Sequence, residues 1–277
     1  MRESIIGKII DKVLFIEEKM KNAASGILGC EEHDLYHQAW YRGISDCSYE
    51  LIPNIYRNDF SYTKLREKEM IDIFETYIPM FLKKANFLEF KHDFELYFVA
   101  QHYGLKTRLL DWTKSLISAI YFAVQNYKHN SNINAAIWVL NPSLMNYLFH
   151  SCDYPLIPSN ENISNYWFSN DCLPEFPLAI YPIANNERIL AQQGVFTIFG
   201  NENNSLENII KKYLDNNSDK YKIKISEDDI IFKIVIENNE INKIKKELNI
   251  LGINHVTEFP ELQSVSRYIN EDFSDNT

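Results

Sequence analysis

The chain has 277 residues, of which 45% are hydrophobic, so it is long and apolar enough to bury a sizeable core in one large domain. Its net charge of −10 argues against a broad basic surface for nonspecific binding of nucleic acid. No apolar run approaches the ~20 residues of a membrane span, and the N-terminus lacks the pattern of a secretory signal, so we expect a cytoplasmic protein with no membrane partner.

The first part of the chain predicts two helices with a strand between them. Residues 5–21 carry apolar side chains at helix spacing, and residues 64–85 form a longer amphipathic helix that Pro79 kinks or breaks. Residues 36–42 are aromatic and compact, which favours a strand that ends at Gly43.

The central stretch, residues 101–123, reads as the end of one buried helix, a polar loop and the beginning of a second buried helix. Residues 94–100 are too apolar for a surface helix, and Gly104 stands where a left-handed residue would end that helix. Residues 116–124 form the second buried helix, and Asp111, Thr113 or Ser115 could cap it. Polar groups in an apolar setting need partners, so this loop is the first place to look for function. Its polar residues are Gln101, His102, Thr107, Arg108 and Asp111.

The second half of the chain predicts strands and helices around an irregular insertion. Residues 135–140 are a continuous apolar run typical of an interior strand, and residues 143–182 form an insertion with short helices that could act as a lid. The remaining predicted elements are two short strands within residues 188–199, a helix and loop at 202–217, a strand at 230–236 and a helix at 240–251.

Together these elements predict an α+β fold. We expect a single mixed domain with a central small sheet, a buried helix pair and a helical N-terminal extension. The expected boundaries are residues 1–35 for the extension, 36–265 for the main domain and 266–277 for a flexible C-terminal tail.

Arg42 and Gly43 form the first candidate binding element. An arginine at the end of an aromatic strand, beside a glycine that permits close backbone approach, suits a phosphate or a carboxylate ligand. The alternative is a structural arginine in an ion pair with Asp111 or Glu187.

A second candidate lies in the central loop. His102 could act as a general base beside Gln101, and Arg108 could clamp a phosphate. Alternatively, Asp111 caps the following helix and pairs with Arg108, while His102 bonds to backbone carbonyls. Asp111 and Thr113 are expected to be structural.

The third candidate is the segment from Arg188 to the turn at Gln192 and Gln193. Its two amides could read a base or a ribose by hydrogen bonds, or they could be solvated residues of a hairpin turn. No metal site is predicted, because the four cysteines lack zinc-type spacing and the pair His33/His37 has no third ligand.

Four segments together resemble the FRG domain family, whose name describes a phenylalanine-or-tyrosine, arginine, glycine motif. That motif stands at Tyr41-Arg42-Gly43 and is followed by LIPNIYRN at residues 51–58. The other matching segments are QHYG leading into TRLLDWT at 101–113, a turn with Gln193, Gly194 and Phe196, and a Phe-Pro-x-Leu segment at 259–262.

The motif order also resembles, more distantly, the arginine-serine-glutamate layout of ADP-ribosyltransferases. This resemblance implies that Arg42 holds a phosphate of NAD and that Ser115 orders the site. The late position holds Gln192 or Gln193 where that layout has a glutamate, so Glu187 or Asp111 would have to supply the carboxylate.

These resemblances imply a function that the residues alone do not supply. We expect a bacterial protein that binds a nucleotide-like or other anionic ligand and acts as an ADP-ribosyltransferase-like enzyme in phage defence or as a toxin. NAD is the expected cofactor, and a protein or nucleic acid is the expected target. The assigned catalytic residues are His102, Gln193 and Glu187; the assigned ligand-binding residues are Arg42, Gly43, Gln101, Arg108, Ser115, Arg188 and Gln192.

Two alternatives remain open. One is a noncatalytic sensor or interaction domain that binds a small anionic ligand. The other is a nuclease-like or phosphotransfer enzyme that uses His102 and Asp111.

Overall fold

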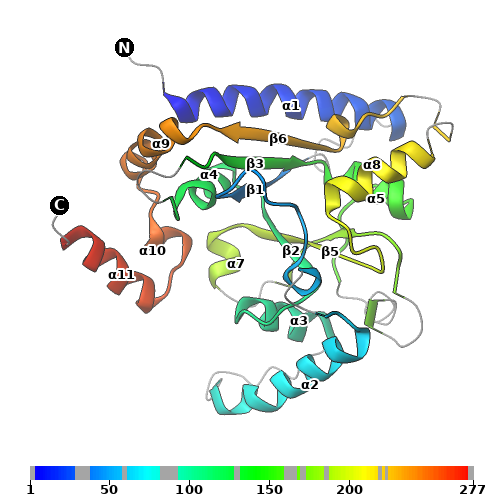
Figure 1. The fold of residues 1–277 in the computed structure, drawn as a ribbon, viewed down its shortest axis with the longest axis horizontal. Helices are drawn as coiled ribbons and strands as arrows, with labels where there is room; N and C mark the ends of the chain where they lie inside the picture. Colours follow the sequence, from blue (N-terminus) through cyan, green and yellow to red (C-terminus); the bar gives the residue numbers. More distant parts are fainter. Residues whose placement is uncertain are drawn as a thin grey trace.

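The centre of the molecule is one antiparallel sheet with helices on both of its faces (Figure 1). The computed structural model describes residues 4–28, 38–57, 61–81, 93–127, 132–158, 167–168, 173–183, 187–217, 220–221 and 224–273. Within these residues the sheet has six strands, which confirms the predicted α+β class. In order across the sheet they are β4 (Leu178–Ile180), β5 (Gly194–Ile198), β2 (Leu109–Thr113), β1 (Trp40–Ile44), β3 (Ala135–Leu140) and β6 (Ile231–Ile236).

The helices of the described residues surround this sheet, and none of them is both long and apolar enough to cross a membrane. They are α1 (Ile5–Leu28), α2 (Lys64–Phe81), α3 (Asp93–His102), α4 (Leu116–Val124), α5 (Pro142–His150), α7 (Glu187–Ala191), α8 (Leu206–Asn216), α9 (Asn238–Ile250), α10 (His255–Glu258) and α11 (Leu262–Phe273), with 3₁₀ turns at Asn54–Tyr56 and Glu227–Asp229.

Strand β3 explains why the sheet is covered on both faces. Its side chains alternate between two hydrophobic cores: Ile137 and Val139 pack with α1, α4 and α9, whereas Trp138 and Leu140 pack with α5 and α8. All six residues of the strand are buried. A strand with helices on both faces needs apolar residues at every position. The interior strand predicted at residues 135–140 is therefore confirmed.

Helix α1 belongs to the same core as α4 and α9. Its buried residues recur at helix spacing and include Ile9, Val13, Ile16 and Met20. The Tyr41 hydroxyl of β1 donates a hydrogen bond to Glu17 and so links this helix to the sheet. The predicted N-terminal extension is thus packed directly on the sheet.

Gly43 permits the contact between β1 and α4. A Cβ atom at this position would lie 1.9 Å from the carbonyl oxygen of Ala119 and 2.6 Å from the backbone nitrogen of Ala123. Only a residue without a side chain allows the helix backbone to approach the strand this closely.

Helix α3 packs beneath the other half of the sheet. Phe94, Tyr97 and Phe98 share a third core with Leu109 of β2 and Phe196 of β5. The helix is followed by Gly104, whose φ of +86° is the left-handed conformation predicted for the end of this helix.

The prediction of a polar loop across residues 101–115 was wrong for its second half. Residues 109–113 form β2, which pairs with β1 on one side and β5 on the other. A five-residue run with Leu110 and Trp112 buried suits a strand in the middle of a sheet, although its local pattern does not distinguish it from a loop between helices. Consequently Asp111 does not cap α4; Ser115 does, by accepting a hydrogen bond from the backbone nitrogen of Ser118 at 3.2 Å.

Four other predicted segments differ from the expectation or lie partly outside the described residues. Residues 187–191 form α7, so only the second of the two predicted strands in that segment exists as β5. Helix α2 continues through Pro79, and the predicted residues 82–85 lie outside the described residues. The predicted lid segment contains α5 and β4, while α11 occupies residues 262–273 and therefore most of the predicted tail.

Candidate ligand pocket

A polar cavity of about 480 Å³ opens beside the centre of the sheet, where β1 and β2 meet the end of α3, α7 and the residue after α10. It brings together residues from all three segments that the sequence singled out. The predicted residues that line it are Arg42, Gly43, Gln101, His102, Asp111, Thr113, Arg188 and Gln192.

Strand register explains why these distant segments meet. Tyr41 of β1 pairs with Thr113 of β2, and Thr113 pairs with Gly194 of β5. The three motif segments therefore lie side by side across three neighbouring strands. The Thr113 hydroxyl donates to the carbonyl oxygen of Gln192 at 2.6 Å and accepts from the backbone nitrogen of Ser115 at 2.9 Å, which holds the ends of these segments together.

Arg42 stands at one side of the cavity, with its side chain 20% exposed. Its guanidinium donates to the carbonyl oxygen of Asp111, and Nη1 lies 3.8 Å from the Asp111 carboxylate. Burial lowers the pKa of Arg42, the Asp111 charge opposes that shift, and the neighbouring cation Arg57 adds to it. The cavity thus holds two arginines close enough to repel each other.

Asp111 keeps an accessible carboxylate in the same cavity. Its side chain is 56% exposed, and both of its oxygens accept from Gln101 Nε2, at 3.2 and 3.1 Å. The Thr107 hydroxyl donates to Gln101 Oε1 at 2.5 Å and fixes the orientation of that amide. Asp111 is therefore positioned by Gln101 and Arg42 and still faces solvent.

Arg188 and His102 form the opposite side of the cavity. The Arg188 guanidinium lies over the ring of Phe259, 4.5 Å from its centroid. Burial lowers the pKa of His102, the charge of Arg188 lowers it further, and Glu261 opposes both effects. The lowered pKa favours the uncharged imidazole, which can accept a proton.

Arg108 lies elsewhere and is fully paired. Its side chain is 1% exposed, and Nε lies 2.9 Å from Glu67 of α2. The same guanidinium donates to the carbonyl oxygens of Phe199 at 3.0 Å and Trp167 at 3.3 Å. Burial acts to lower the pKa of Arg108, but Tyr97 and Glu67 raise it above its ordinary value.

Ser115, Glu187 and Gln193 do not line the cavity either. Ser115 is the N-cap of α4, Glu187 is the exposed first residue of α7, and Gln193 is exposed with a φ of +47°. The cavity lining instead includes Arg57, Asn54 and Phe259, which the sequence reasoning did not assign. Arg57 and Asn54 belong to the segment LIPNIYRN, so that motif carried a usable signal.

Within the residues that the structure describes, no group of three or more histidine, cysteine, aspartate or glutamate side chains is placed to hold a metal ion. The polar groups of the cavity are arginines, amides and hydroxyls together with the His102 imidazole and the Asp111 and Glu50 carboxylates.

The part of the chain that holds β1, β2 and α4 matches a known family model. Residues 37–132 match the family model of the FRG domain. The matched FRG segment runs from the start of β1 past the end of α4 and carries Arg42, Arg57 and Asp111, while Arg188, Gln192 and Phe259 lie beyond it. Neither the curated proteins nor the solved structures contain a match to the chain.

Proposed function

We propose that the cavity beside β1 and β2 binds an anionic, nucleotide-like small molecule. The supporting observation is the meeting of Arg42, Arg57 and Arg188 in one solvent-accessible cavity. Like charges held close together cost free energy, and a bound phosphate offsets that cost through charge-assisted hydrogen bonds. The volume of about 480 Å³ falls within the usual range for small-molecule sites, roughly 300–1,000 Å³.

The cavity also offers groups for the uncharged parts of such a ligand. Tyr49 lines the cavity and is 56% exposed, and Phe259 lines it with its ring packed against Arg188. The rings of these two residues provide surfaces on which a base can stack. The amides of Asn54 and Asn126 can donate to and accept from hydroxyl groups or base edges. In this proposal the arginines hold the phosphates and the aromatic residues hold the base.

NAD is the first ligand to test, with ADP-ribosyl transfer as the reaction. The observation that favours it is that Arg42 on β1, Thr113 on β2 and Gln192, two residues before β5, line one cavity; Ser115, the serine that the resemblance implies, does not line it. In this reaction the bond between ribose C1′ and the nicotinamide nitrogen breaks, nicotinamide leaves with the bonding electrons, and the acceptor bonds to C1′ and loses a proton. Asp111 would stabilise the positive charge on the ribose, and His102 would take the proton.

The binding proposal is tested by titration calorimetry of the full chain with NAD, ADP-ribose and AMP. We expect Arg42→Ala and Arg188→Ala each to weaken binding by about tenfold or more, as loss of a charge-assisted contact does. Arg66→Ala is the matched control, because this exposed arginine of α2 contacts the carbonyl oxygen of Ser61 and does not line the cavity. Absence of binding, or equal losses in Arg42→Ala and Arg66→Ala, would refute the proposal.

The chemical step is tested separately. Release of nicotinamide from NAD, and transfer of label from NAD to protein or nucleic-acid acceptors, should occur with the parent chain and fall steeply in Asp111→Asn. Binding without turnover would favour the noncatalytic sensor instead. We also propose that the protein acts in a defence or toxin system. Cells that express the chain would then be challenged with phage, and Arg42→Ala should abolish any protection that the parent chain gives.

A further inference from the structure

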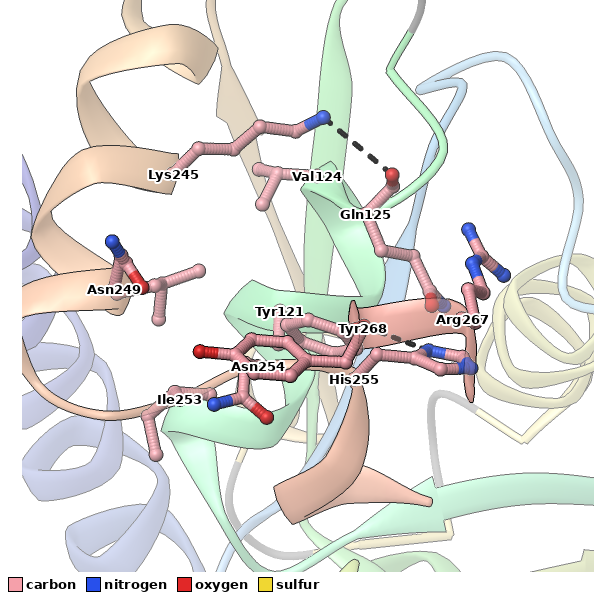
Figure 2. Close-up of a pocket in the computed structure, with 11 residues that line it drawn as sticks. Tyr121, Val124, Gln125, Lys245, Asn249, Ile253, Asn254, His255, Arg267 and Tyr268 are labelled. Carbon is pink, nitrogen blue, oxygen red and sulfur yellow. Dashed lines mark hydrogen bonds between the residues drawn. The ribbon is translucent and has the colours of Figure 1, made fainter. Parts of the chain in front are cut away.

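A second cavity, of about 380 Å³, lies between α4, α9 and α11 (Figure 2) and adjoins the ligand pocket at Gln125, which lines both. Consecutive residues of α4 face the two spaces, since Tyr121 lines this second pocket and Phe122 lines the ligand pocket. Helix α10 stands between them in the same way: His255 at its start lines the second pocket, and Phe259 just after its end lines the ligand pocket.

The lining of the second pocket is basic in an otherwise acidic protein. Lys245 of α9 and Arg267 of α11 reach it from different helices, His255 of α10 also lines it, and the described residues that line it include no aspartate or glutamate. The chain as a whole has a net charge of −10, so this concentration of basic groups is not an average property of its surface. A locally positive lining attracts anions.

Hydrogen bonds hold two of these basic groups at the edge of the space. Lys245 Nζ donates to the backbone carbonyls of Gln125 at 3.5 Å and Tyr127 at 3.4 Å, and Figure 2 shows its side chain running along the cavity toward the first of these. Nδ1 of His255 lies 3.1 Å from the Tyr121 hydroxyl, which fixes the plane of the imidazole. Both lysine contacts are long, so they can yield to a stronger acceptor such as a phosphate oxygen.

Uncharged polar groups complete the lining. The side chains of Gln125, Asn249 and Asn254 border the cavity, and Tyr268 of α11 adds a ring and a hydroxyl. Amides both donate and accept, so they can bind hydroxyl groups and base edges. The volume lies near the lower end of the roughly 300–1,000 Å³ range of small-molecule sites.

We propose that the second pocket binds a small phosphorylated molecule of mononucleotide size. Lys245 and Arg267 contact the phosphate, and the amides with Tyr268 contact the uncharged part of the molecule. A ring contact links the two pockets. The His255 ring of the second pocket lies 4.6 Å from the Phe259 ring of the ligand pocket, and Arg188 packs over that phenylalanine.

The test uses inorganic phosphate and AMP as probes, with binding to the full chain measured by calorimetry and by thermal stabilisation. The titrations are repeated in Arg42→Ala/Arg188→Ala, so that failure of the proposed ligand pocket cannot be mistaken for failure of the second pocket. We expect at least one probe to bind in both backgrounds; phosphate binding identifies a phosphate site, and binding of AMP alone identifies a site that also needs the nucleoside.

Two variants and a matched control locate the site. Lys245→Ala removes the positive charge of the lysine, and Asn249→Asp places a carboxylate that repels the phosphate on an exposed position. Each variant should weaken the binding of the probe by about tenfold or more. Lys246→Ala makes the same charge change one residue along α9, on an exposed side chain that does not line the cavity, and should leave affinity unchanged. The proposal is overturned if neither probe binds, or if Lys245→Ala and Lys246→Ala behave alike.

Discussion

Arginine plays two different roles in this protein, set by the partners of each side chain. Arg108 is buried and has its guanidinium fully engaged by Glu67 and two backbone carbonyls. Arg42 donates to the carbonyl oxygen of Asp111, has the exposed carboxylate of that residue 3.8 Å away, and shares its cavity with Arg57 and Arg188. The first is a structural element, and the second retains capacity for a ligand.

Arg108→Met should destabilise the fold strongly. It leaves the Glu67 carboxylate buried without its cation, and breaking a buried pair costs about 3–5 kcal/mol. Chemical denaturation of the purified variant measures the change in the free energy of unfolding. The double variant Glu67→Met/Arg108→Met should be closer to the parent than Arg108→Met alone, because it leaves no unpaired charge; a double variant that is less stable than the single one would contradict this account.

Glu258 is a buried carboxylate with incomplete pairing. Its Oε1 accepts from the Ser118 hydroxyl at 3.0 Å, while no group among the described residues donates to Oε2. Burial raises the pKa of Glu258, and the Ser118 hydrogen bond only partly opposes this. The folded state therefore binds this proton more tightly than the unfolded state, so its contribution to stability is present at low pH and is lost as pH rises through the folded pKa.

Glu258→Gln should raise the melting temperature at about pH 8, because the amide is neutral and can still accept from Ser118. The gain should shrink toward zero as the pH falls below about 4.5, where Glu258 is protonated in both states. Calorimetric scans of both chains across this range provide the measurement. A gain that is the same at every pH would mean that ionisation of Glu258 is not its cause.

At the scale of elements, the contact between β1 and α4 depends on one glycine. Gly43→Ala would place a Cβ atom against the backbone of α4, which can relieve the clash only by moving the helix. We expect a loss of about 1–3 kcal/mol or more in the free energy of unfolding, measured in urea. The matched control is Gly194→Ala at the start of β5, where the nearest atom would be 3.8 Å away and the change should be small. Equal losses in the two variants would show that helix packing is not what Gly43 provides.

At the scale of the whole molecule, a side chain of α9 binds the start of α1, the first helix of the described residues. Glu247 of α9 accepts hydrogen bonds from the backbone nitrogens of Ile5 at 3.0 Å and Ile6 at 2.9 Å and from the Ser4 hydroxyl at 2.8 Å. It therefore caps the first turn of α1 from more than 240 residues away in the sequence. A carboxylate at this position satisfies exposed backbone donors and complements the helix dipole.

Glu247→Ala should cost about 1 kcal/mol at neutral pH, as loss of an N-cap does. Burial tends to raise the pKa of Glu247, but its bonds to Ile6, Ile5 and Ser4 lower it below the ordinary value. The contribution is thus present above the ordinary glutamate pKa and is lost as pH falls through the folded value. Urea denaturation at pH 7 and about pH 3 should show a larger difference from the parent at the higher pH. Glu237→Ala, at the N-cap of α9 where the side chain makes no capping hydrogen bond, should show little change at either pH.

The sequence by itself determined the elements whose burial pattern is local. Helix α1 and strand β6 were predicted from the spacing of their apolar residues, because each presents a regular apolar face to a core. Strand β3 was predicted from its continuous apolar run, and α9 from its charge pairs and the glycine that follows it. Gly104 was predicted to end α3 because a left-handed backbone favours glycine.

Tertiary structure alone decided what β2 is and which polar groups share a site. Five residues are too few for a period to separate strand from loop, and pairing with β1 and β5 is what fixes their conformation. The partner of Arg108 lies 41 residues away and that of Arg42 lies 69 residues away, and nothing local encodes such separations. Whether an arginine binds a buried carboxylate or lines a cavity depends on packing. The motifs therefore located the cavity beside β1 and β2, and the LIPNIYRN motif contains Arg57, but only the fold shows that Arg108 does not line this cavity.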